Sequence, residues 1–366
     1  MTRRSWWSQV DYGLLALLAL LCSLGLVVLW SASHGPGGHV AGYAYRQARW
    51  MGLGCVALLL AVAVDYRRLD RHAVGLYLGV MALLALVLVL GRTTMGAQRW
   101  LALGPIRFQP SELAKIATAV MTAHLLAREP RQPPYGLREI VLPLGAAAVL
   151  ATLVLVQPDL GTAVLVAGVA GAQILFQGVR RRLVLAAGGA AAAGLPAAWS
   201  LLHDYQRQRI LTFLNPERDP LGAGYHIIQS KIAVGSGQLL GKGFLKGTQA
   251  HLQFLPERHT DFIFSVLAEE WGFVGAAGVL LLYALLILWG LDIAARARDS
   301  FGRLLAVGLT AILFFHVVVN VGMVLGLLPV VGVPLPLFSY GGSSVLTTFL
   351  IVGLLLNVRM RRFARL

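Results

Sequence analysis

The chain is built from apolar runs of about 20 residues, the length needed to cross a bilayer as a helix. Hydrophobic residues make up 57% of the sequence and charged residues only 13%, about half the charged share of a soluble domain. Backbone inside lipid must satisfy its own hydrogen bonds, which a helix does, and the runs lack the alternation of barrel strands. We therefore expect an all-α polytopic membrane protein, with residues 1–366 forming one integral membrane domain.

Ten spans are predicted, and the segment between the seventh and eighth is the one long connection. The spans cover roughly residues 12–33, 46–64, 73–91, 109–127, 140–157, 159–178, 183–202, 262–292, 304–328 and 342–358. Residues 203–261 are polar and glycine-rich, and within them Tyr225, Ile228 and Ile232 share one helical face. Short amphipathic helices of this kind lie on a membrane surface. We expect a large loop with such helices beside a compact bundle.

Basic residues are distributed unevenly between the two sides that ten spans define. The formal net charge of +15 would by itself suit nucleic-acid binding. Most arginines, however, fall in short segments on the side of the N-terminus, such as residues 67–71 and 180–182. This asymmetry is the positive-inside rule. It predicts cytoplasmic termini, an extracytoplasmic 203–261 loop, and membrane lipid rather than nucleic acid as the surroundings.

The sequence carries no motif for an organic cofactor. Cys22 and Cys55 lie inside predicted spans, so no disulfide framework is expected. The glycine-rich segment 235–247 lacks the final Lys-Ser/Thr of a nucleotide-binding loop. The histidines and cysteines form no metal cluster. A divalent cation, Mg²⁺ or Mn²⁺, would therefore be held by carboxylates or by the substrate.

Several ionisable residues lie where lipid is expected, and such residues usually face a bundle interior or a wet cavity. Glu112 and Lys115 are one helical turn apart and can pair. Two interpretations stay open for them: an ion pair that joins helices, or a charged cavity wall that contacts substrate. One of Glu269 and Glu270 is expected to point inward and meet a basic partner.

Other polar residues have simpler interpretations as helix caps and helix contacts. Asp159 in QPDLGTA suits the N-cap of a tight hairpin. His316 and Asn320 are four residues apart and favour a hydrogen bond between helices. The stretch 320–344 is rich in proline and glycine, so it cannot be regular helix. We interpret it as a re-entrant loop that lines a substrate groove and includes Ser343, with a purely structural cap as the alternative.

Asp261 stands apart, because it sits at the outer mouth of a span within the acidic and basic cluster PERHTDF. Basic residues from several outer segments can gather near it, and these are Arg99, Arg107, Arg209, Arg218, Lys231, Lys242 and Lys246. Positive charge on this side is not needed for topology. It suits an anionic substrate such as a lipid-linked phosphate or pyrophosphate, although a solvated surface charge set would also account for it.

Four stretches resemble one family. They are GAQRWLALGPIRFQPSELAK (96–115), QPDLGTA (157–163), the segment 214–272, and NVGMVLGLLPVVGVPLPLFSYGGSS (320–344). In this order they resemble the SEDS proteins (shape, elongation, division and sporulation). The forms GKGFLKGTQ and FLPERHTDFIF look more like the elongation branch, RodA, than the division branch.

The resemblance implies a peptidoglycan glycosyltransferase that polymerises lipid II, the undecaprenyl-pyrophosphate-linked disaccharide-pentapeptide, outside the cytoplasmic membrane. It implies that Asp261 is the catalytic residue and that Glu112 and Lys115 are functionally important. It also implies a class B penicillin-binding protein as transpeptidase partner, within a complex of elongation proteins.

An α-linked donor and a β-1,4 product require inversion, which a single displacement achieves with a base on one face. We hypothesise that Asp261 is that general base or a metal ligand. Arg99, Arg209, Lys231, Lys242 and Lys246 would then bind the substrate. Two rivals remain: a lipid II flippase, which would need a polar path across the bilayer, and a non-catalytic scaffold for the transpeptidase.

Overall fold

The structure is a computed structural model that describes residues 10–34, 42–94, 97–103, 106–201, 204–219, 223–251, 254 and 257–363. A long helix stands at each of the ten predicted spans, which confirms the helical membrane class. These helices are α1 (Tyr12–Ala32), α2 (Tyr43–Ala63), α4 (Ala73–Leu90), α5 (Pro110–Ala127), α6 (Leu137–Val156), α7 (Leu160–Gln177), α8 (Arg181–Leu201), α12 (Ile263–Ala295), α13 (Ser300–Val324) and α14 (Gly342–Met360).

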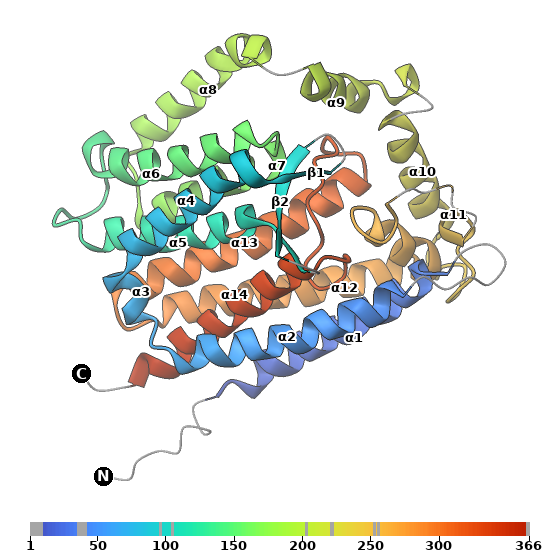
Figure 1. Ribbon diagram of the computed structural model, residues 1–366, viewed down its shortest axis with the longest axis horizontal. Coiled ribbons are helices and arrows are strands. Elements are labelled where there is room, and N and C mark those ends of the chain that lie inside the picture. The colour runs from blue at the N-terminus through green and yellow to red at the C-terminus, as the bar shows by residue number, and fades with distance from the viewer. Residues whose placement is uncertain are drawn as a thin grey trace.

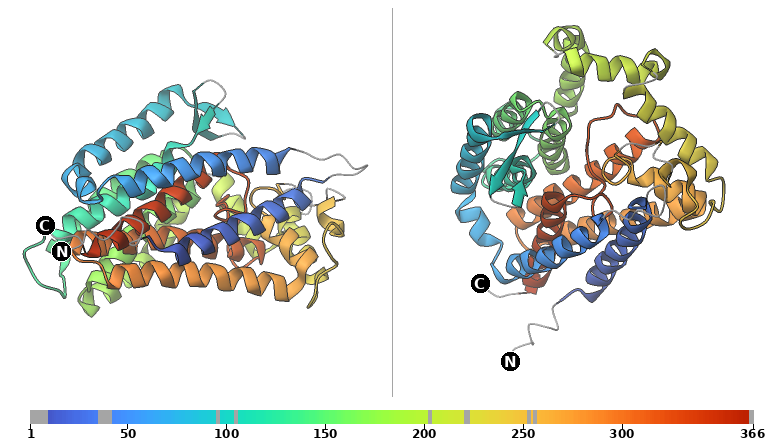
Figure 2. Two further views of the ribbon diagram at one scale, coloured as in Figure 1. Left: turned by 90° about the horizontal axis from the view of Figure 1, so that it is seen from below. Right: turned by 45° about the vertical axis from the view of Figure 1, so that its right-hand side comes forward.

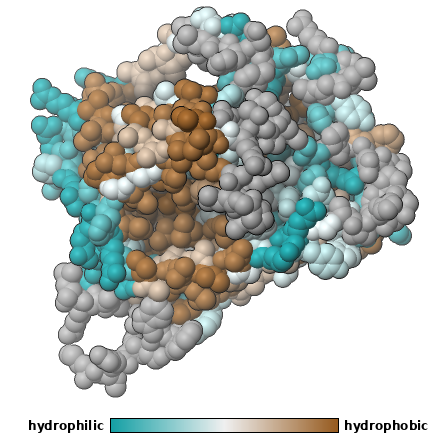
Figure 3. Space-filling view, viewed as in Figure 1, coloured by the Kyte–Doolittle hydropathy of each residue, from teal (hydrophilic) through white to brown (hydrophobic). Residues whose placement is uncertain are grey.

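Seven of these helices are long and apolar enough to cross a membrane on length and composition alone: α1, α4, α6, α7, α12, α13 and α14. Helices α2 and α5 are less apolar because α2 carries Arg46 and Arg49, and α5 carries Glu112 and Lys115. The face seen in Figure 3 has a broad hydrophobic band with hydrophilic residues toward the ends of the bundle. The molecule is a multi-pass membrane protein.

The helices begin where local signals predict that they should. Asp11, Asp159 and Asp299 each accept a hydrogen bond from a backbone N–H in the first turn of the helix that follows, the usual role of an N-cap. Pro110 occupies the first position of α5, where its missing N–H costs nothing. The N-cap role predicted for Asp159 is therefore confirmed.

The long helices run side by side along the longest axis of the molecule (Figures 1 and 2). Helices α13 and α14 form the centre of the bundle. In the most apolar 18-residue stretch of each helix, 72% and 83% of the residues are buried. Helix α14 packs on α2, and α13 packs on α5, α7 and α12. Helix α8 stands at the periphery, with most of its described side chains exposed.

The start of α1 and the end of α14 lie at one end of the bundle, together with the short helix α3 (Arg67–Arg71), as Figure 1 shows. The opposite end, which we call the site end, carries most of the irregular and polar structure. Within residues 203–261 the structure places α9 (Asp204–Leu214), η3 (Pro216–Arg218), α10 (Ala223–Ser236) and α11 (Thr248–His251). A second short 3-10 helix, η4 (Arg361–Phe363), follows α14.

The site end also holds a small antiparallel sheet that the sequence analysis did not predict. Its strands are β1 (Arg92–Thr94), β2 (Ala97–Leu103) and β3 (Ile106–Phe108), in the order β1-β2-β3. In the register, Leu101 faces Phe108 across the β2–β3 pair. The strands are too short to give a clear pattern beside the neighbouring apolar helices, so the sequence predicted only a loop between two spans.

Candidate functional site

Asp261 lies in a tight turn, residues 257–262, that enters α12. Glu257 has a positive φ of 52°, and its carbonyl accepts hydrogen bonds from the N–H groups of Thr260 and Phe262 at 3.1 and 3.3 Å. The Thr260 hydroxyl donates to the Glu257 carboxylate at 3.0 Å. The turn is closed on itself, so it presents the partly buried Asp261 side chain in one fixed position.

The loop 325–341, between α13 and α14, packs directly against this turn. Asn320 donates from Nδ2 to the carbonyl of Asp261 at 3.0 Å and to that of Val333 at 2.8 Å. Ser339 donates to the carbonyl of Thr260 at 2.5 Å. A Cβ atom added to Gly332 would lie 3.5 Å from the Asp261 carboxylate. The predicted re-entrant segment is therefore the wall against which Asp261 rests.

His316 and Asn320 do more than the helix-to-helix hydrogen bond expected of them. His316 contacts Lys115 of α5 through Nε2 at 2.6 Å, which is a contact between helices, and its Nδ1 lies 3.0 Å from the carbonyl of Pro334. Asn320 donates to two backbone carbonyls that lie outside the helices. Both residues hold the irregular loop, because its free carbonyls need donors when they are buried.

The surroundings of Asp261 change its acidity. Burial and, to a smaller extent, the negative charge of Glu257 raise the pKa of the Asp261 carboxyl to about 6, although the positive charges of Arg209 and Arg99 act in the opposite direction. A carboxyl with a pKa near neutrality can both hold and release a proton under physiological conditions. Arg99 and Arg209 are therefore predicted basic residues whose positive charges interact with Asp261.

Arg99 reaches the site from β2 and is fixed to the turn between α6 and α7. Its guanidinium donates to the carbonyl of Gln157 at 3.2 Å and to that of Pro158, and it lies 3.8 Å from the Asp159 carboxylate. Gln109 donates to Asp159 as well, at 3.2 Å. The small sheet, which the sequence did not reveal, thus carries an arginine whose charge acts on Asp261.

Glu112 and Lys115 form a buried ion pair, with Lys115 Nζ 2.7 Å from the Glu112 carboxylate. Lys115 is 0% exposed and Glu112 4% exposed. With His316 the pair joins α5 to α13 and to Pro334. The ion pair lies within α5, and the contact of Lys115 with His316 joins it to α13. Of the two interpretations left open by the sequence, this geometry matches an ion pair that joins helices. Substrate contact by either residue stays a prediction.

The remaining predicted substrate-binding residues are distributed more widely. Lys242 is paired with Glu269, with Nζ 2.6 Å from Oε1, so a predicted acidic residue of α12 does meet a basic partner. Lys231 lies over Gly326, beyond the C-terminus of α13, and Lys246 is exposed over Gly243.

Ser343, in the first turn of α14, is buried and accepts a hydrogen bond from the backbone N–H of Gln109 at 3.2 Å. Its hydroxyl therefore joins the α14 terminus to the strand that precedes α5. The side chains of Arg107 and Arg218 lie outside the described part of the structure.

Among the described residues there is no group of three or more His, Cys, Asp or Glu side chains arranged around a metal. The carboxylates of Asp261 and Glu257 interact electrostatically. Glu112 is already engaged by Lys115. Hard oxygen donors of this kind suit Mg²⁺ or Mn²⁺, so Asp261 and Glu257 are the residues that would hold such an ion.

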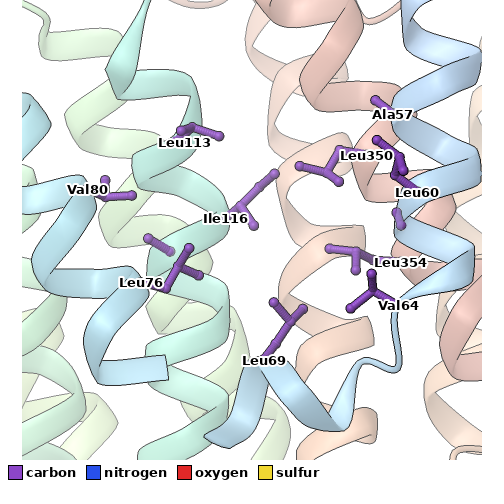
Figure 4. Close-up of a pocket in the computed structure, with 12 residues that line it drawn as sticks. Ala57, Leu60, Val64, Leu69, Leu76, Val80, Leu113, Ile116, Leu350 and Leu354 are labelled. Carbon is purple, nitrogen blue, oxygen red and sulfur yellow. The ribbon is translucent and has the colours of Figure 1, made fainter. Parts of the chain in front are cut away.

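An apolar pocket of about 350 Å³ opens between α2, α4, α5 and α14 (Figure 4). Its lining is Ala57, Leu60, Ala61, Val64, Leu69, Leu76, Val80, Leu113, Ile116, Ala117, Leu350 and Leu354. Such a lining can hold hydrocarbon, but it presents no charged or hydrogen-bonding side chain. The pocket therefore contributes no group that could act on a sugar or a phosphate.

Comparisons with known proteins agree on one family. The family model described as "Cell cycle protein", named for FtsW, RodA and SpoVE, matches residues 12–363. The peptidoglycan glycosyltransferase MrdB of Escherichia coli strain K12 is 49% identical over 365 residues, which include 98% of this chain and 96% of the relative.

Solved structures agree with the sequence relatives. A chain from the structure described as "Structural coordination of polymerization and crosslinking by a peptidoglycan synthase complex" has a TM-score of 0.83 and 38% identity, over 97% of this chain and 99% of its own. The crystal structure of Thermus thermophilus rod shape determining protein RodA has a TM-score of 0.72 and 34% identity, over 97% and 98%.

Proposed function

This chain belongs to the FtsW, RodA and SpoVE family of cell cycle proteins, and we propose that it is a peptidoglycan glycosyltransferase. Its substrate is lipid II, which it polymerises into β-1,4 glycan strands at the outer face of the bacterial cytoplasmic membrane during cell elongation. The observation that carries the proposal is Asp261, a carboxyl with a pKa raised to about 6 beside Arg99 and Arg209. The Asp261 carboxylate can accept a proton there, while the guanidinium groups of Arg99 and Arg209 attract an anionic substrate.

Asp261 acts as the general base of a single inverting displacement. The 4-hydroxyl oxygen of the acceptor sugar forms a bond to C1 of the donor as Asp261 takes the hydroxyl proton. The bond between C1 and the pyrophosphate oxygen breaks, and its electron pair leaves with the lipid pyrophosphate. Attack from the face opposite the leaving group inverts the anomeric centre.

Arg99 and Arg209 stabilise the charge that develops on the leaving pyrophosphate. Arg99 is held by two carbonyl groups of the α6–α7 turn, so its charge does not need to reorganise during the reaction. A divalent cation held by Glu257 and substrate oxygens would supply further positive charge to the pyrophosphate. Asp261 as a metal ligand is the alternative to Asp261 as the base. The protein residues themselves bind, orient and deprotonate the substrate.

The site end faces the extracytoplasmic side, and both termini are cytoplasmic. The start of α1 and the end of α14 lie at the same end of the bundle, and arginine-rich short connections such as α3 lie at that end, as the positive-inside rule requires. Lipid II presented in the outer leaflet would then meet Asp261 directly. A class B penicillin-binding protein is the proposed partner, since one similar chain comes from a peptidoglycan synthase complex.

The test is a polymerisation assay with the chain purified beside its transpeptidase partner. Labelled lipid II and Mg²⁺ or Mn²⁺ are supplied, and the products are separated on a gel. Asp261→Asn removes the base, and Asp292→Asn, on the helix that follows Asp261, is the matched control, since Asp292 is partly exposed and pairs locally with Arg296 at 2.7 Å. We expect a glycan ladder from the wild type and the control, and none from Asp261→Asn.

A folded, partnered wild type that makes no ladder would contradict the proposal. It would favour the flippase or scaffold hypothesis, and the basic residues of the site end would then serve as a lipid-docking surface.

A further inference from the structure

Helix α12 is broken near its site end, and the break divides it into a short segment and a long segment. Gly272 has φ 64° and ψ −165°, which no helical residue adopts. The short segment, residues 263–271, is almost wholly buried and follows directly after Asp261. It therefore carries the catalytic carboxyl at one end and ends in free backbone groups at the other.

The glycine-rich segment 237–249, which we call the insert, fills this break. Its N–H groups donate to carbonyls of the short segment, and its carbonyls accept from N–H groups of the long segment. The bonds are Lys242 to Glu269 at 3.0 Å, Gly243 to Glu270 at 2.9 Å, Phe273 to Gln238 at 2.9 Å and Val274 to Leu239 at 3.1 Å. Helix ends buried without such partners would cost several kcal/mol in a membrane protein.

Glycine is required on both sides because the backbones are in direct contact. A Cβ atom on Gly272 would lie 2.3 Å from the nitrogen of Gly241, and one on Gly241 would lie 2.1 Å from the carbonyl oxygen of Glu270. Gly237 is equally close to the carbonyl of Ala268, at 2.0 Å. The glycine residues of the insert thus allow its backbone to pack closely on α12, and the insert is an ordered part of the site end.

One side chain of the short segment fastens the insert. Glu269 is 0% exposed, and its Oε1 accepts from Lys242 Nζ at 2.6 Å, from the Thr248 hydroxyl at 3.1 Å and from the N–H of Gln249 at 3.1 Å. Its other oxygen is buried and has no hydrogen-bond partner among the described residues. Without the Lys242 ammonium, this carboxylate would be a buried charge with no counter-charge in contact.

The neighbouring Glu270 fixes the same segment to α1, accepting from the Ser31 hydroxyl at 2.5 Å. At the other end, Asn320 and Ser339 hold the turn that contains Asp261. The short segment is therefore anchored at both ends. Glu269 lies six residues beyond Ile263, the first residue of α12, about 9 Å along the axis, and Asp261 precedes Ile263 by two residues. Glu269 therefore acts on Asp261 through the segment's position and not by contact.

We propose that Lys242 and Glu269 are positioning residues for Asp261: their ion pair holds the insert in the break of α12 and so sets where the catalytic carboxyl stands. The proposal rests on the proposed glycosyltransferase function. It assigns Lys242 a role different from direct contact with lipid II. A misplacement of about 1 Å at the reacting group can cost about a hundredfold in rate, which is the scale expected when the pair is broken.

The test compares Lys242→Met, Glu269→Gln and the double variant Lys242→Met/Glu269→Met, each purified with the partner and checked for a monodisperse elution peak. Arg296→Met is the control, because it breaks an exposed ion pair on the same helix at the far end. kcat and KM for lipid II are measured by the polymerisation assay. Wild type and Asp261→Asn are run beside them, so a failure of the proposed function shows as an inactive wild type.

Each single variant should lower kcat about 10- to 100-fold with KM for lipid II within about twofold of wild type. The double variant should recover about tenfold over Lys242→Met, since replacing both members of a buried pair by apolar side chains is often nearly neutral. The control should match the wild type. If Lys242→Met does not fold, the double variant and Glu269→Gln decide.

Three results would overturn the proposal while leaving the proposed function standing. The first is Lys242→Met with a raised KM and unchanged kcat, which would make Lys242 a substrate contact. The second is a double variant as inactive as Lys242→Met. The third is wild-type kcat in both single variants.

Discussion

The acidity of Asp261 predicts how polymerisation depends on pH and how two neighbours shift that dependence. A general base works in its ionised form, so activity should be lost as pH falls through the pKa of the Asp261 carboxyl. Because that pKa is raised to about 6, the loss should occur between pH 7 and pH 5. An aspartate at the ordinary value of 3.8 would stay mostly ionised over this range.

The expected size follows from the titration itself. With a pKa of about 6, the ionised share falls from about nine-tenths at pH 7 to about one-tenth at pH 5, so kcat/KM should fall about tenfold. Glu257→Gln removes a negative charge that raises the pKa, and the midpoint should move to lower pH. Arg99→Gln removes a positive charge that lowers the pKa, and the midpoint should move to higher pH.

The assay is the initial rate of lipid II polymerisation at fixed ionic strength from pH 4.5 to pH 8.5, with each profile scaled to its own plateau. Scaling separates the shift in midpoint from any loss in maximal rate, which Arg99→Gln should also show. Asp292→Asn serves as the control and should keep the wild-type midpoint. A midpoint that stays at the wild-type value in Glu257→Gln, or that moves the same way in both variants, would refute the reasoning.

Three further predictions concern stability. Asn320→Leu leaves the carbonyls of Asp261 and Val333 without their donor, so it should cost about 2–4 kcal/mol and at least tenfold in activity; an unchanged melting temperature would count against it. Lys115→Met should lower the free energy of unfolding by about 3–5 kcal/mol, because Glu112 stays buried without its partner. Adding Glu112→Gln to the same chain should restore most of this loss. Wild-type stability with a raised KM for lipid II would instead make these residues substrate contacts. Asp261→Asn should raise the free energy of unfolding at pH 7.5 by up to about 3 kcal/mol, because a raised carboxyl pKa means that ionisation disfavours the folded state above about pH 6. This gain should vanish below about pH 4. Equal melting temperatures of the variant and the wild type at pH 7.5 would contradict the prediction.

The ten spans and their helical class could be predicted because an apolar segment of about 20 residues satisfies its backbone hydrogen bonds in lipid by forming a helix. The N-cap at Asp159 was equally predictable, since capping depends on residues three positions apart. The ion pair of Glu112 and Lys115 followed from helical spacing. In each of these cases the deciding contact is local in sequence.

The parts that the sequence did not reveal depend on long-range contacts. The bond from Asn320 to the carbonyl of Asp261 joins residues 59 apart, and the pair of Lys242 and Glu269 joins residues 27 apart. The pair exists only because α12 breaks at Gly272, and a single glycine within an apolar run gives little sign of a break. Arg99 reaches the site through a sheet of short strands, which apolar periodicity does not detect.

In the proposed mechanism Asp261 carries out the chemistry and is not needed to hold the substrate. Lipid II binding and single-turnover transfer, measured in the same preparation of Asp261→Asn with its partner, separate these two roles. We expect binding within a few fold of wild type and no detectable glycan product. Transfer at a rate near that of the wild type would contradict it.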